Sequence, residues 1–127
     1  MSNPPAEHPE VTRLKALMWK RSFFMMTRQV VDPSKLGAVA LDHYRWMIAQ
    51  EKAGKVFLSG PLLDKDGNKS AGVTIFRADS WEEAHALASA DPFVTSGGVT
   101  YSLQVWQINE GRLSISVDFS DMTFQAD

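Results

Sequence analysis

Residues 55–78 read KVFLSGPLLDKDGNKSAGVTIFRA, and this stretch decides the fold. It predicts a strand at Lys55–Ser59 that ends at Gly60, a turn at Asp64–Asn68 and a second strand at Gly72–Ala78. The turn is too short to hold a helix, so the two strands are expected to be antiparallel neighbours. A three-layer parallel fold would need a helix between them and is therefore excluded.

The elements on both sides of this hairpin complete a known pattern. A first strand is predicted at Phe23–Val31, a helix at Pro33–Lys52, a second helix at Ser80–Asp91 and a last strand at Thr100–Ile108. The order is strand, helix, strand, strand, helix, strand. The sequence therefore predicts an α+β, ferredoxin-like βαββαβ fold, with an antiparallel sheet and both helices on one of its faces.

Two further elements are expected outside this core of residues 23–108. Apolar residues at helical spacing predict a short helix over Val11–Arg21, before the first strand. Alternating apolar and polar residues predict a half-buried extra strand at Leu113–Ser120. We expect residues 1–10, which hold three prolines, to form a flexible tail, and residues 11–127 to form a single domain.

Composition excludes several classes of protein. Of the 127 residues 44% are hydrophobic and 22% charged, as in a globular domain, and the net charge of −2 indicates neither a nucleic-acid partner nor a membrane surface. The absence of cysteine excludes disulfides and thiolate ligands, and the three histidines lie too far apart in the sequence to predict a metal site. Without an apolar leader or a membrane-length apolar run, the expected location is the cytoplasm.

The predicted strands are apolar on both faces, although the two helices cover only one. In the first strand, for example, Phe23 and Met25 alternate with Phe24 and Met26. A large apolar sheet face left in water indicates an interaction site. The simplest cover is a second copy of the chain, so we expect a homodimer or a higher homo-oligomer.

His43 is the first candidate for chemistry. On a helical wheel it falls in the middle of the inward face that Leu36, Ala40 and Met47 define. An imidazole placed there needs a hydrogen-bond partner, because an unpaired buried polar group costs about 1–3 kcal/mol. His43 is therefore either a core histidine with a satisfied hydrogen bond or part of a catalytic site.

Asp91 is the expected partner of His43. The first helix begins, and the second helix ends, at the same end of the fold, which brings these two residues together. An aspartate bound to one ring nitrogen would fix the tautomer and raise the basicity of a general base. A carboxylate at a helix C-terminus is also disfavoured by the helix dipole, which favours a functional role for Asp91 over a purely structural one. On this interpretation, Asp91→Asn is expected to leave folding nearly intact and to weaken proton transfer.

These residues occur in an order that resembles the YciI-like (YCII-related) family. The resemblance covers about Phe23 to Ile108 and is based on His43, on Gly54, and on the segments Leu58-Ser59-Gly60-Pro61 and Asp91-Pro92-Phe93. It implies a dimeric α+β barrel in which His43 and Asp91 act as an acid–base pair. It also implies that Gly60, Pro61 and Phe93 form the wall of a substrate pocket.

The leading functional hypothesis is an enzyme that needs no cofactor and acts on a small lactone- or carbonyl-containing acid. The resemblance to muconolactone-type enzymes implies an isomerase or lyase, and isomerisation, elimination or hydration would all suit a single histidine base. His43 would transfer the proton, Asp91 would orient its ring, and backbone amides near Gly60 or Gly97 could stabilise negative charge. The alternative is a non-catalytic small-molecule-binding or assembly module of the same fold. His85 is interpreted as a packing residue.

Overall fold

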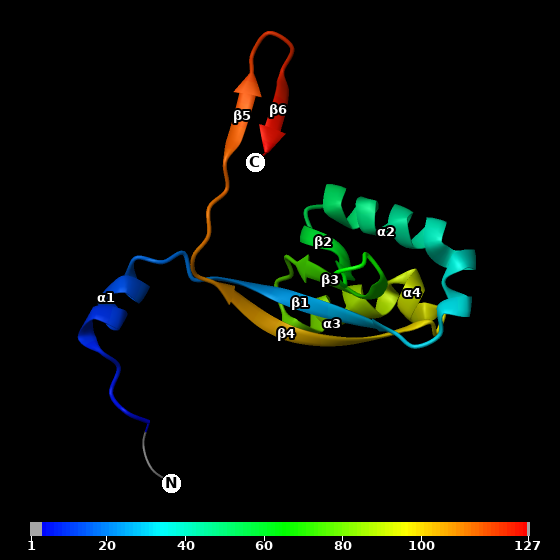
Figure 1. Ribbon diagram of the computed structural model, residues 1–127, viewed down its shortest axis with the longest axis horizontal. Helices are drawn as coiled ribbons and strands as arrows, with labels where there is room; N and C mark the ends of the chain where they lie inside the picture. Colours follow the sequence, from blue (N-terminus) through cyan, green and yellow to red (C-terminus); the bar gives the residue numbers. More distant parts are fainter. Residues whose placement is uncertain (1–3, 127) are drawn as a thin grey trace. The chain divides into compact units, whose positions relative to one another are not determined.

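The computed structural model describes residues 4–126, which form two compact units (Figure 1). The first unit is Ser22–Gln107. The second consists of the two flanking segments, up to Arg21 and from Ile108 onward.

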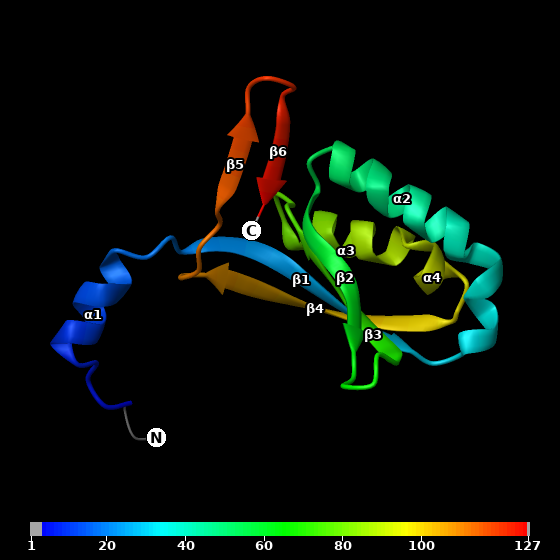
Figure 2. The same cartoon turned by 45° about the horizontal axis from the view of Figure 1, so that its top comes forward.

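The first unit has the predicted βαββαβ order. Its four strands form one antiparallel sheet in the order β2-β3-β1-β4, and Figure 2 shows α2 and α3 on the same side of it. The ferredoxin-like α+β fold is thereby confirmed. The elements are β1 (Arg21–Val30), α2 (Ala40–Lys52), β2 (Val56–Leu63), β3 (Lys69–Phe76), α3 (Trp81–Ala90), α4 (Pro92–Thr95) and β4 (Val99–Ile108).

The core lies between the sheet and these helices. Met26, Phe76 and Ala88 are fully buried there, and partly buried apolar side chains such as Trp46 of α2 pack around them. Residues that pair across an antiparallel ladder point to the same face of the sheet, and so do residues two apart in one strand. Arg28 therefore faces the helices like Met26, and its ladder partner Gly72 lies on the same face as Phe76.

Several boundaries in this unit differ from the sequence predictions, and two of them have a clear physical reason. The expected helix over Pro33–Lys52 is two short 3-10 turns, η1 (Pro33–Lys35) and η2 (Gly37–Val39), followed by α2. Gly37 has a low helix propensity, which accounts for a break at this point. The second strand does not end at Gly60, because β2 continues through Pro61 to Leu63. A proline is tolerated there because β2 is an edge strand and needs no ladder donor on its outer side.

The N-terminal segment of the second unit holds α1 (Pro9–Ala16), which begins and ends earlier than the expected Val11–Arg21. His8 caps this helix, since its Nδ1 accepts a hydrogen bond from the backbone N–H of Glu10. Pro9 then occupies the first turn, where its missing N–H costs nothing. Residues 9 and 10, expected in the tail, are thus helical.

The C-terminal segment forms a hairpin of two short strands, β5 (Ile115–Asp118) and β6 (Thr123–Ala126), rather than one half-buried strand over Leu113–Ser120. The observed pairs Ile115↔Ala126 and Val117↔Phe124 put apolar residues on one face of the hairpin. The other two pairs, Ser116↔Gln125 and Asp118↔Thr123, are polar, and every residue of both strands is exposed. The alternation correctly predicted one apolar and one polar face, but the apolar face is exposed and not buried as expected.

No helix within residues 4–126 is long and apolar enough to cross a membrane.

Candidate active site

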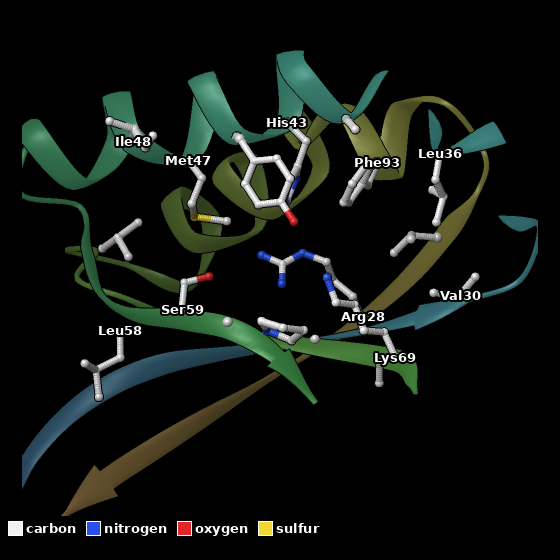
Figure 3. A pocket seen from close by; sticks show the side chains of 18 of the residues that line it. Arg28, Val30, Leu36, His43, Met47, Ile48, Leu58, Ser59, Lys69 and Phe93 are labelled. Atoms are coloured by element: carbon white, nitrogen blue, oxygen red, sulfur yellow. The ribbon is translucent and has the colours of Figure 1, made fainter. Parts of the chain in front are cut away.

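A pocket of about 680 Å³ opens between α2 and strands β1, β2 and β3 of the first unit (Figure 3). His43 and Phe93 contribute to its lining on the helical side, and Gly60 and Pro61 on the side of β2. Four of the five residues predicted for the site therefore meet at one cavity. The fifth, Asp91, does not line the pocket but is in contact with His43.

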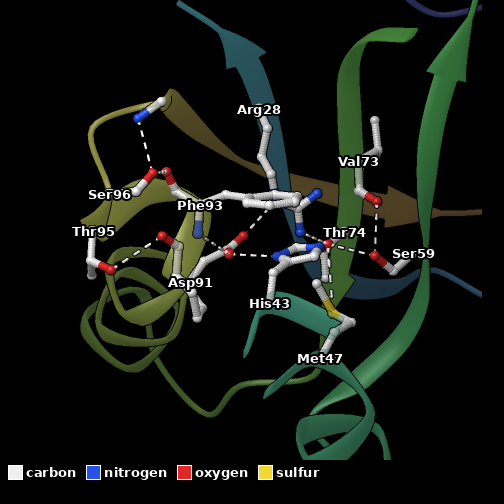
Figure 4. Close-up of polar contacts among 12 residues, drawn as sticks. Arg28, His43, Met47, Ser59, Val73, Thr74, Asp91, Phe93, Thr95 and Ser96 are labelled. Atoms are coloured by element: carbon white, nitrogen blue, oxygen red, sulfur yellow. Dashed lines mark hydrogen bonds and ion pairs between the residues drawn. The ribbon is translucent and has the colours of Figure 1, made fainter. Parts of the chain in front are cut away.

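His43 and Asp91 form a buried pair. The Nδ1 atom of His43 lies 2.6 Å from Oδ1 of Asp91, although 48 positions separate the two residues in the sequence. The aspartate is completely buried and the histidine is 7% exposed. Figure 4 shows the two side chains meeting in front of β1, one from α2 and the other from the turn between α3 and α4.

The carboxylate of Asp91 accepts three hydrogen bonds within the protein. Besides His43, the donors are Nε of Arg28, at 2.7 Å from Oδ2, and the backbone N–H of Phe93, at 2.9 Å from Oδ1. Burial by itself would raise the pKa of Asp91, but the hydrogen bonds from His43, Arg28 and Phe93 outweigh it and lower this pKa below its ordinary value. Asp91 is therefore an anion at neutral pH.

The charge of Asp91 determines the tautomer of His43. An ionised carboxylate only accepts hydrogen bonds, so Nδ1 of His43 carries the hydrogen and, in the neutral ring, Nε2 carries the lone pair. Nε2 makes no hydrogen bond to any described residue. Every fully buried side-chain nitrogen or oxygen of residues 4–126 has a hydrogen-bond partner. Nε2 is thus accessible from the pocket that His43 lines.

Two aromatic rings hold the imidazole in place. Phe93 stacks on His43 with ring centroids 3.8 Å apart and an angle of 10° between the planes. Tyr44, the next residue of α2, meets the same ring edge-on at 5.0 Å. Since all three rings line the pocket, Phe93 both orients His43 and forms part of the wall.

Sequence reasoning missed Arg28, the most buried cation of the site. Its side chain is 6% exposed, and its Nη2 donates to Oγ1 of Thr74. Thr74 in turn lies 2.7 Å from Oγ of Ser59, so one polar chain runs from Asp91 across the sheet to β2 (Figure 4). A signal was present in the sequence, because position 28 has the parity of the inward residue Met26, where an arginine is exceptional.

Asp91 also has a structural role that the helix-dipole argument overlooked. It ends α3, but it is the N-cap of α4, where its carboxylate accepts the hydrogen bond from the N–H of Phe93. An aspartate is favoured at a helix N-cap. Its position at the end of α3 is therefore not evidence for function. The contacts with His43 and Arg28 are the features that relate it to the pocket.

The remaining sequence candidates lie elsewhere. Gly97 does not line the pocket, and its φ of +83° belongs to the turn before β4. His85 is exposed and hydrogen-bonded to the hydroxyl of Tyr101, so it is not the packing residue that was expected. In the part of the chain that the structure describes, no three His, Cys, Asp or Glu side chains are grouped so as to hold a metal ion.

Fold and site together define the class of this protein: a ferredoxin-like α+β domain with a histidine–aspartate pair at a pocket between a helix and the sheet. The chain belongs to the family of the YCII-related domain, whose model matches residues 23–109. This confirms the family resemblance seen in the sequence.

The chain is also similar to two known proteins. The uncharacterized protein YjpA of Bacillus subtilis (strain 168) is 29% identical over 68 residues, which are 54% of this chain and 75% of YjpA. Among solved structures, 5-chloro-2-hydroxyhydroquinone dehydrochlorinase (TftG) from Burkholderia phenoliruptrix AC1100, in complex with 2,5-dihydroxybenzoquinone, is similar at 21% identity and a TM-score of 0.49. That match covers 65% of this chain and 92% of TftG.

Proposed function

We propose that this protein is an enzyme that transfers a proton on a small lactone- or carbonyl-containing acid, with His43 as the base and Asp91 as its positioning residue. The observation that carries the proposal is the open Nε2 of a buried histidine whose Nδ1 is held 2.6 Å from a carboxylate. A histidine with only a packing role would have no reason to present a free ring nitrogen to a cavity of about 680 Å³.

The proposed step is the removal of a proton from a carbon atom next to a carbonyl group. Nε2 of His43 takes the proton, and the electron pair of the broken C–H bond moves onto the carbonyl oxygen, which gives an enolate. Returning the proton to a different carbon is an isomerisation, and loss of a leaving group from the enolate is an elimination. Asp91 stays ionised and stabilises the imidazolium that forms.

Hydrogen–deuterium exchange at carbon tests this step without requiring a complete reaction. The full chain is incubated in D2O with muconolactone and related γ-lactone acids, and 1H NMR follows the C–H signal beside the carbonyl. We also include 5-chloro-2-hydroxyhydroquinone, the compound in the name of TftG, and follow it for loss of chloride. We expect exchange or turnover above the buffer rate with at least one member of this panel.

The informative variant is His43→Ala, and the matched control is His85→Ala. General acid–base catalysis contributes about 100- to 10,000-fold, so His43→Ala is expected to lose at least about 100-fold in rate. His85 lies outside the pocket, and its substitution is expected to leave the rate unchanged. Equal rates in the wild type and His43→Ala, or no reaction with any compound of the panel, would reject the enzyme and favour the non-catalytic binding module.

The proposal includes a cytoplasmic location and a homodimer, and the chemistry needs no cofactor. Support for the dimer comes from the strands that border the pocket. Leu58 and Leu62 of β2 are 57% and 47% exposed, and their ladder partners Ile75 and Ala71 put them on the sheet face opposite the helices. Light scattering tests this part of the proposal, since only a 14.1 kDa species at micromolar concentration would contradict it.

A further inference from the structure

One nitrogen atom of the Arg28 guanidinium group has no hydrogen-bond partner among the described residues. Its Nε is bound to Asp91 and its Nη2 to Thr74, whereas Nη1 makes no hydrogen bond to any described residue. As argued for His43, a fully buried polar atom without a partner is not found within residues 4–126. Nη1 is therefore open to the pocket, which Arg28 lines (Figure 3).

The strand next to Arg28 leaves room for this nitrogen. Its ladder partner is Gly72, and a Cβ atom at that position would lie 3.1 Å from Nη1 and 3.5 Å from the carbonyl oxygen of Gly60. The side chain of any other residue would push against the guanidinium or fill the space in front of it. Glycine at position 72 thus keeps the approach to Nη1 open.

The charges around the pocket favour a negatively charged ligand. Arg28 and Lys69 both line it, and no ion pair of Lys69 is present among the described residues. The only carboxylate in the described lining is that of Glu51, which lies 3.7 Å from the ammonium group of Lys52. Asp91 neutralises one unit of this charge through Nε of Arg28, but this hydrogen bond leaves Nη1 without a carboxylate partner.

We infer that Nη1 of Arg28 binds the substrate oxygen that becomes negatively charged when His43 removes the proton. This inference rests on the proposed function and specifies its ligand as an enolate-type oxyanion. The proton that leaves carbon ends on Nε2 of His43, and the electron pair it leaves behind ends on the oxygen held by Arg28. The summed charge of Arg28, Asp91, His43 and substrate is the same before and after the transfer, so no uncompensated charge is created in a buried site.

Arg28 thus takes the role that backbone amides near Gly60 or Gly97 were expected to play. A guanidinium suits this role because its donors are fixed in a plane. Two of the three guanidinium nitrogen atoms, Nε and Nη2, are bound to Asp91 and Thr74, so the third, Nη1, is oriented before the substrate arrives. Such preorganised donors act on the charge that develops in the transition state.

A pair of small lactones tests the assignment. Tetronic acid has an acidic enol and is present at neutral pH as tetronate, a planar five-membered lactone with an enolate oxygen. Its methyl ether, methyl tetronate, has almost the same shape but no charge. We expect the wild-type protein to bind tetronate at least about tenfold more tightly than methyl tetronate, measured by titration in 1H–15N NMR spectra.

The decisive variant is Arg28→Lys, which keeps the charge and removes the fork of donors. Its single nitrogen is expected to stay with Asp91, so the preference for tetronate should fall to less than about threefold. Arg77→Lys is the matched control, since Arg77 does not line the pocket and stacks over Phe57 instead. An unchanged preference in Arg28→Lys, or an equal loss in Arg77→Lys, would overturn the inference.

A measurement on the wild-type protein covers the case that Arg28→Lys does not fold. In protein labelled with 15N-arginine, tetronate should shift the guanidinium signals of Arg28, and methyl tetronate should not. No shift with tetronate would overturn the inference. The carbon exchange assay separates this result from the proposed function. If carbon exchange requires His43 but tetronate binds without Arg28, only the inference about Arg28 fails. If Arg28 binds tetronate but carbon exchange is independent of His43, only the proposed function fails.

Discussion

Asp91→Asn gives the sharpest test of how the site is built. The new side chain keeps one carbonyl oxygen, which can accept from His43 and from the N–H of Phe93 as Oδ1 does now. Its amide group then takes the place of Oδ2 and presents hydrogens to the Nε–H of Arg28. The substitution therefore leaves the guanidinium of Arg28, a residue that is only 5% exposed, without its counter-charge.

The size of the effect follows from this buried ion pair. Removing one partner of such a pair costs about 3–5 kcal/mol, because the other charge stays buried and unpaired. Proteins of this size are stable by about 5–15 kcal/mol, so the variant is expected to lose a large part of its free energy of unfolding. The expectation from the sequence, that Asp91→Asn would fold nearly normally, omitted Arg28 and needs this revision.

Urea unfolding followed by tryptophan fluorescence measures the loss, since Trp46 packs against the core. With a dependence of about 1–3 kcal/mol per molar urea, the midpoint of Asp91→Asn should fall by at least about 1 M. Glu83→Gln is the matched control, because Glu83 is bound to Lys55 at 2.6 Å but both side chains are partly exposed. Its midpoint should change much less.

A second variant identifies the cause of the instability. In the double variant Arg28→Met, Asp91→Asn no unpaired charge remains, so it should be more stable than Asp91→Asn alone. The reasoning would be refuted if Asp91→Asn shifted the midpoint no more than Glu83→Gln does. It would also be refuted if Arg28→Met lowered the free energy of unfolding of Asp91→Asn by as much as it lowers that of the wild type.

Two further predictions concern stability. Because the pKa of Asp91 is lowered in the folded protein, its contribution to the free energy of unfolding is complete above about pH 5 and is lost as the pH falls through the folded-state pKa. Urea titrations between pH 3 and 7 should show this loss in the wild type and not in Asp91→Asn. Gly98→Ala should cost about 1–3 kcal/mol in the same assay, because its Cβ would lie 2.4 Å from Cδ2 of Leu36 and 3.0 Å from the carbonyl oxygen of Asp32. Gly60→Ala, which meets no atom within 4 Å, should not destabilise the protein, and equal losses in the two variants would contradict the packing argument.

The order of elements and the position of His43 could be predicted because both follow from local patterns. A turn too short for a helix makes its flanking strands antiparallel, and helical spacing places His43 on the inward face of α2. The contact with Asp91 follows from topology, because in this fold α2 begins where α3 ends. These inferences need only the direction of each element.

Arg28 was missed because its role depends on two elements at once. The alternation of β1 shows that position 28 faces inward, but only the partner strand reveals Gly72 beside it and only the end of α3 supplies Asp91. A charged residue at an inward strand position is the signal to look for in related sequences. Its partner has to be found among buried carboxylates, since an unpaired inward charge would not be tolerated.

The edges of the elements were the least predictable features. A proline ends a strand in the interior of a sheet but is tolerated in an edge strand, as Pro61 is in β2. Whether a strand lies at the edge is a property of the whole fold and cannot be read from the local sequence. In the same way, the alternation in the C-terminal segment predicts a strand with two faces. It does not reveal that the partner is β6, a few residues further along the chain.

The central claim is that Asp91 holds His43 in the tautomer whose Nε2 can accept a proton from a substrate. The 15N NMR signals of the imidazole ring test it directly, at a pH where the ring is neutral and in a His8→Ala, His85→Ala background in which His43 is the remaining histidine of the sequence. We predict a hydrogen on Nδ1 of His43 and none on Nε2. A hydrogen on Nε2 with a bare Nδ1 would contradict the account, because the base would then point at Asp91 instead of into the pocket.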